Sequence, residues 1–80
     1  MKIIKILIVE DSNFMRLSLK RLFNEVEDVK VVYSASNGLE ALEILKNRDI
    51  DVILLDLFMP KMDGIETLKE IMQIKPLPVL

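Results

Sequence analysis

The chain has 80 residues, 51% of them hydrophobic, and a net charge of −2. It contains neither cysteine nor histidine, which excludes a disulfide framework, a zinc-thiolate site and catalysis by Cys-His or Ser-His-Asp groups. Its mixed charges include no basic block, and the apolar run at its start is too short to span a membrane and is followed at once by acids. We therefore expect one small cytoplasmic domain that binds neither nucleic acid nor membranes.

The first predicted elements are a strand and a helix. Residues 2–9 form a nearly continuous apolar run, typical of a strand that is covered on both faces of a sheet. The next helix is expected to begin at an N-cap supplied by Ser12 or Asn13. Its apolar side chains recur at helical spacing, at Met15, Leu19, Leu22, Phe23 and Val26. The first four of these are expected to form the face packed against the sheet.

The rest of the chain continues to alternate between strand and helix. The pattern predicts strands over residues 29–35 and 52–55, helices over 39–46 and from Gly64 to the proline at 76, and the opening of a fourth strand at 79–80. This alternation is typical of βαβ units in a parallel sheet, whose helical crossovers are nearly always right-handed. The predicted strand order places the first strand between the second and the third, with the fourth outside the third. The first helix is expected on one face and the other two on the opposite face.

Three acids occur where two of these strands end. Glu10 and Asp11 follow the first strand, and Asp56 follows the third. Burying an unpaired carboxylate costs several kcal/mol, so these acids are not expected to be core residues. If the two strands are neighbours, the three carboxylates converge at one edge of the sheet, where open α/β sheets bind ligands. Oxygen donors alone favour a hard cation such as Mg²⁺.

Three motifs carry a family resemblance. Residues 9–12 (VEDS), 51–56 (DVILLD) and 59–64 (MPKMDG) resemble the receiver domain of two-component response regulators. Residues 11–16 (DSNFMR), 71–72 and 76–79 are most similar to the receiver of the chemotaxis methylesterase. The resemblance implies a flavodoxin-like, three-layer α/β/α fold with a parallel sheet, and a role in chemotaxis signalling.

The resemblance also implies roles for individual residues. Asp56 would accept a phosphoryl group from a histidine kinase, and Mg²⁺ would be held by Asp11, Asp56, Glu10 through water, and the backbone carbonyl of Phe58. Glu10 and Asp11 would also suit the dipole of the following helix, which is compatible with metal binding. The aromatic ring of Phe58 either slows hydrolysis of the phosphoryl group or covers loop surface. Asp63 is expected only to cap the third helix.

Two other function classes fit the sequence less well. A magnesium-dependent phosphatase of similar topology would need a second acid two residues after the nucleophile, where this chain has Phe58. The methylesterase activity of the similar proteins would reside in a separate catalytic domain. We therefore expect that the chain is not an enzyme.

By resemblance, residues 1–80 are the first two-thirds of a receiver, truncated after the start of strand four. A complete receiver adds a hydroxyl residue after strand four and a lysine after strand five, so phosphotransfer by these 80 residues alone is expected to be poor. Apolar residues of the first and third strands are expected to be uncovered on one face. The alternative function is therefore a non-switching interaction module that forms a homodimer or domain-swapped oligomer.

Overall fold

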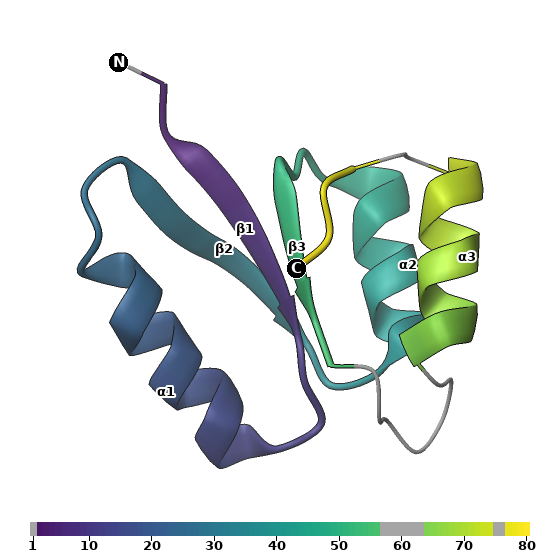
Figure 1. Cartoon of the computed structure of the whole chain (residues 1–80), viewed down its shortest axis with the longest axis horizontal. Helices are drawn as coiled ribbons and strands as arrows, with labels where there is room; N and C mark the ends of the chain where they lie inside the picture. The colour runs from purple at the N-terminus through teal and green to yellow at the C-terminus, as the bar shows by residue number, and fades with distance from the viewer. Residues whose placement is uncertain (1, 57–63, 75–76) are drawn as a thin grey trace.

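The computed structural model describes residues 2–56, 64–74 and 77–80. Its three strands form one parallel sheet in the order β2-β1-β3, as predicted (Figure 1). The first three predicted strands and the three predicted helices are present, with small shifts at the ends of β1 and α2. In chain order the elements are β1 (Ile4–Val9), α1 (Asn13–Asn24), β2 (Val29–Ala35), α2 (Gly38–Asn47), β3 (Val52–Leu55) and α3 (Gly64–Ile74).

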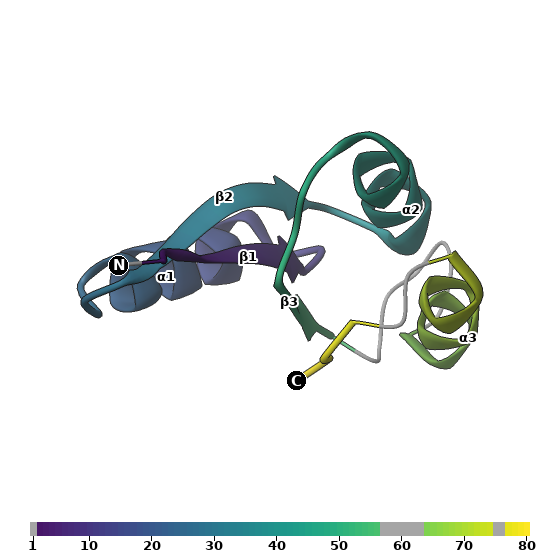
Figure 2. The ribbon, with the colours of Figure 1, turned by 90° about the horizontal axis from the view of Figure 1, so that it is seen from above.

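The helices form a layer on each face of the sheet, as the sequence predicted. Helix α1 lies on one side, and α2 and α3 lie next to each other on the other side (Figures 1 and 2). Side chains of β1 alternate between the two layers, so that Ile6 and Ile8 pack beneath α1 while Leu7 and Val9 pack toward α2. Since both faces of β1 are buried, its nearly continuous apolar sequence is explained.

The two cores differ in size. The α1 side buries Ile6, Ile8 and Val31 of the sheet, and α1 itself contributes only the half-buried Leu19 and Phe23. The α2–α3 side contains most of the buried apolar side chains among the described residues. They are Leu7, Val9, Ala35, Ala41, Leu42, Leu45, Ile50, Ile53, Leu55 and Ile71.

Two expectations about the α1 face need correction. Met15 and Leu22 were expected to lie in the core, but their exposed fractions are 43% and 60%. Apolar residues of the first and third strands were expected to be uncovered on this face, which is wrong for β1, because Ile6 and Ile8 are buried. On this face Val52 and Leu54 of β3 are only partly buried.

Side-chain caps fix where two helices begin. The Ser12 hydroxyl accepts the Met15 N–H (3.2 Å), so Ser12 is the N-cap of α1, one of the two residues predicted. The Asn37 side chain accepts the Glu40 N–H (2.9 Å) and caps α2, which therefore starts at Gly38. The predicted cap Asp63 lies outside the described residues.

The last described residues pair with the outer edge of β3. Val79 and Ile53 form a parallel bridge, and the Leu80 N–H donates to the Ile53 carbonyl (2.8 Å). The predicted position of the fourth strand outside the third is therefore confirmed, although the pairing is an isolated bridge. None of the described helices is both long and apolar enough to cross a bilayer.

Candidate metal centre

Glu10 and Asp56 emerge side by side because β1 and β3 run parallel. Val9 and Leu55 are register partners at the ends of these strands. The ladder continues one step further, since the Asp56 N–H donates to the Val9 carbonyl and the Glu10 N–H donates to the Ala35 carbonyl of β2 (both 3.0 Å). The backbone therefore delivers both acids to the carboxyl-terminal edge of the sheet.

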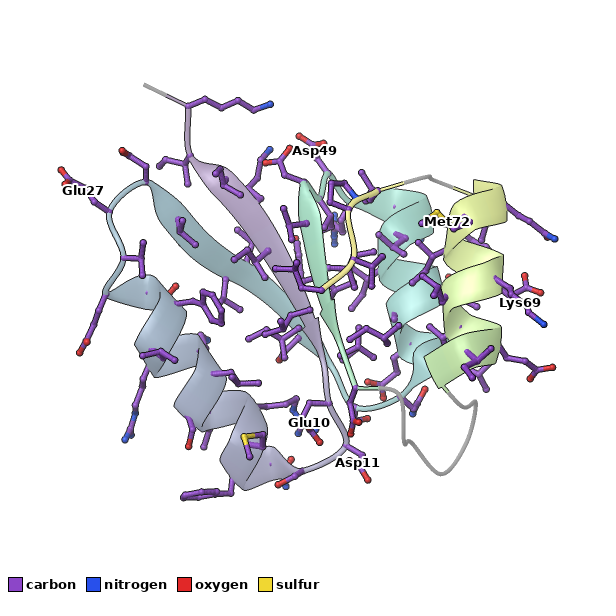
Figure 3. The ribbon with its side chains drawn as sticks, in the orientation of Figure 1. Glu10, Asp11, Glu27, Asp49, Lys69 and Met72 are labelled. Atoms are coloured by element: carbon purple, nitrogen blue, oxygen red, sulfur yellow. The ribbon has the colours of Figure 1, made fainter. Side chains whose placement is uncertain are left out.

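Asp11 completes the cluster from the loop between β1 and α1. Figure 3 shows Glu10 and Asp11 together at the end of β1, where the chain turns toward α1. One carboxylate oxygen from each of Glu10, Asp11 and Asp56 lies within 4.8 Å of the other two. The predicted convergence of the three acids is therefore confirmed.

The spacing of these oxygens can be compared with the coordination geometry of Mg²⁺. Ligands at the usual Mg–O distance sit about 2.9 Å apart on adjacent corners of the octahedron and about 4.2 Å apart on opposite corners. Separations of up to 4.8 Å fit this geometry if one acid binds through water or moves slightly. Mg²⁺ ordinarily keeps several waters, so the donor set suits it.

Electrostatics at the centre disfavour charge on Glu10. Burial raises the pKa of Glu10 above its usual value, and a hydrogen bond with Asp11 and the charges of Asp56 and Asp11 raise it further. The Ser12 N–H donates to the Glu10 carboxylate (3.1 Å) and opposes this rise in pKa. A divalent cation would relieve the repulsion among the three acids.

The segment between β1 and α1 that carries Glu10 and Asp11, here called the acidic loop, is held by Arg16, a residue that the sequence analysis did not single out. The Arg16 guanidinium donates to the carbonyls of Glu10 (2.8 Å) and Asp11 (3.3 Å), and also to the side chain of Asn13. The sequence contained one signal for this role, because an arginine in the first turn of a helix opposes the helix dipole.

The predicted site residues thus fall into two groups. Glu10 and Asp56 are half-buried and Asp11 is exposed, and all three meet at one point. Phe58, predicted to supply a carbonyl ligand, lies outside the described residues.

Comparisons with known proteins agree on one family. The response regulator receiver domain matches residues 6–80. A protein-glutamate methylesterase/protein-glutamine glutaminase of Hahella chejuensis is 47% identical over 77 residues, which are 96% of this chain and 20% of that protein. The chain therefore spans about a fifth of the length of such curated relatives.

Solved structures give the same result. The response regulator domain of Thermotoga maritima CheB superimposes with a TM-score of 0.93 at 45% identity, covering 98% of this chain and 58% of that one. A chain of the CheX-CheY-BeF3-Mg+2 complex from Borrelia burgdorferi gives a TM-score of 0.87 at 38% identity, covering 95% and 58%. With the matching sheet order and the acids at its edge, the chain belongs to the response regulator receiver family.

Proposed function

We propose that this chain is the phosphoacceptor module of a chemotaxis-type two-component pathway and that Asp56 accepts the phosphoryl group from a histidine kinase. The observation that carries the proposal is the convergence of Glu10, Asp11 and Asp56 at the carboxyl edge of a parallel sheet. Family membership supports the kind of donor. We place the reaction in the cytoplasm, where ATP is available to such a kinase.

The proposed chemistry is a substitution at phosphorus. A carboxylate oxygen of Asp56 attacks the phosphoryl group, the P–N bond to the kinase histidine breaks, and the imidazole nitrogen keeps the electron pair and takes up a proton. Mg²⁺, when bound, neutralises charge on the transferred oxygens. Asp11 and Asp56 would hold the ion directly, with Glu10 through water and Phe58 through its backbone carbonyl.

Metal binding can be tested by titrating Mg²⁺ and following amide resonances near the acids by NMR. Asp11→Asn and Asp56→Asn should each weaken binding by about tenfold or more, because each removes one of the few protein oxygens on the ion. Asp49→Asn is the matched control, since Asp49 lies at the opposite end of the sheet (Figure 3). If both site variants bind Mg²⁺ as the parent does, the metal centre is wrongly assigned.

Phosphotransfer by these 80 residues alone should be slow. By family resemblance the phosphoryl oxygens also need a hydroxyl and a lysine, and removing one such preorganised contact typically costs ~10²–10³ in rate. Mass spectrometry after incubation with acetyl phosphate should show little stable adduct, and none with Asp56→Asn. Stoichiometric, long-lived modification of Asp56 would show that those groups are not required.

We further propose that the chain is not itself an enzyme. The methylesterase and glutaminase activities in the names of its relatives describe proteins about five times as long. A purified 80-residue chain should therefore release no methanol from methylated glutamyl peptides. Turnover by this chain would contradict that proposal.

Self-association is a second candidate function, favoured by exposed apolar side chains. Met15, Leu22 and Val26 are 43–60% exposed on α1 and just beyond it. An apolar groove also lies between α3 and the last residues, lined by Leu55, Leu68, Met72, Leu77, Pro78, Val79 and Leu80. Sedimentation equilibrium at micromolar concentration should show a homodimer or larger oligomer; a concentration-independent monomer would exclude this function.

A further inference from the structure

Arg16 makes an unusual set of contacts for a helical arginine. It lies in the first turn of α1, where its own N–H donates to the Ser12 carbonyl (2.9 Å). Its side chain points back past the start of the helix and donates to the carbonyls of Glu10 and Asp11 and to the Asn13 side chain. Among the described residues, the atoms that accept hydrogen bonds from the Arg16 side chain are two backbone carbonyl oxygens and one amide oxygen, and none of them is a carboxylate oxygen.

The position of Arg16 is unfavourable for α1 taken alone. A cation in the first turn faces the positive end of the helix dipole, which destabilises the helix. The first turn of α1 itself contains no acid, and the acids nearest to it, Glu10 and Asp11, precede the helix. When a residue is unfavourable for its own helix, the reason for it is expected in another part of the structure. The groups that Arg16 contacts belong to the acidic loop.

We propose that Arg16 is a positioning residue that holds Glu10 and Asp11 in the orientation in which their carboxylates meet Asp56. The two carbonyls that it binds belong to the peptide planes on either side of the Asp11 Cα. Because peptide units are rigid, fixing both planes fixes the direction of the Asp11 Cα–Cβ bond. Both carbonyls accept from one guanidinium nitrogen, Nη1, whose N–H directions are fixed by the planar group, whereas the three N–H donors of a lysine ammonium rotate. This inference rests on the proposed metal centre.

The sign of a mutational effect separates positioning from simple electrostatics. Removing a positive charge near a cation site should strengthen Mg²⁺ binding if charge alone matters. If Arg16 positions the acids, Arg16→Gln should instead weaken binding by roughly 10–100-fold, the usual effect of losing a supporting contact around a metal. Arg16→Lys should give a smaller loss. Arg21→Gln, the same change in the last turn of the same helix, should alter the affinity by less than about twofold because exposed charges are screened.

A second measurement needs no metal. In metal-free protein, NMR order parameters at the Asp11 and Ser12 amides should fall from about 0.85 in the parent and in Arg21→Gln to below about 0.6 in Arg16→Gln. If this loop stays as rigid as in the parent, the inference is overturned, whatever the metal does. If the loop loosens but the parent does not bind Mg²⁺, the positioning role stands and the proposed metal centre fails.

The two measurements also cover a variant that does not fold. If Arg16→Gln is unfolded, Arg16→Lys decides both measurements, because it keeps the charge and most of the side chain. Parent-like Mg²⁺ affinity and parent-like order parameters in Arg16→Lys would then overturn the inference.

Discussion

At the scale of single residues, Glu10 links the acidic centre to stability. Burial, followed by the neighbouring acids, raises its pKa above the usual 4.5, so between these two values the folded protein holds a proton that the unfolded chain has lost. The stability that Glu10 contributes is therefore fully present below pH 4.5 and is lost as the pH rises through the folded-state pKa.

Glu10→Gln should consequently raise the melting temperature at pH 7 and have little effect at pH 3.5, because glutamine stays neutral. Thermal unfolding followed by circular dichroism over this pH range would measure the difference. Glu27→Gln, a change at an exposed acid far from the centre (Figure 3), is the control. A destabilised Glu10→Gln at pH 7 would show that the Ser12 contact outweighs the repulsion.

Residue types and spacing predicted the acidic centre but not the group that supports it. Two acids after one strand and one after another suffice to place Glu10, Asp11 and Asp56 together once the strands are parallel neighbours. Arg16 contacts the acidic loop through backbone carbonyls, which every residue has, and its side-chain contact is to Asn13 rather than to an acid, so residue types alone do not mark its role in the sequence. Only the path of the loop shows this contact.

At the scale of elements, caps decide where α2 begins and hence how β2 leads into it. Asn37 is 8% exposed and its side chain accepts the Glu40 N–H. Asn37→Ala should therefore lower the free energy of unfolding by about 0.5–2 kcal/mol. Asn47→Ala is the matched control, since Asn47 is exposed at the other end of α2 and its loss should have a much smaller effect. Equal effects in urea denaturation would refute a special role for the Asn37 cap.

The spacing of apolar residues predicted that each helix forms more reliably than it predicted which of its side chains are buried. The spacing of Met15, Leu19 and Leu22 correctly predicted α1, because it identifies residues that share a helix face. It does not say how wide a strip of that face another layer covers. The sheet covers Leu19 and Phe23 in part and leaves Met15 and Leu22 exposed. The width of the covered strip is set by tertiary packing, about which the spacing of apolar residues carries no information.

At the scale of the whole molecule, the two helical layers differ in how firmly they are attached. Helix α1 has no buried residue, whereas α2 buries Gly38, Ala41, Leu42 and Leu45. Elements with few buried apolar contacts open at lower free energy than the rest of a domain. We therefore expect α1 to be the less stable of these two helices, although the loop before it carries two of the three acids.

Native-state hydrogen exchange should show this difference directly. Amides of Leu19 and Phe23 should exchange through openings of lower free energy than amides of Leu42 and Leu45. Because the start of α1 is joined to the acidic loop through Ser12 and Arg16, Mg²⁺ bound at that loop should raise the protection of α1. The gain is limited to about 2.7 kcal/mol at a Mg²⁺ concentration 100 times the dissociation constant. Equal protection of α1 and α2 without metal would contradict the expected difference, and unchanged protection of α1 with Mg²⁺ would show that the helix opens without disturbing the centre.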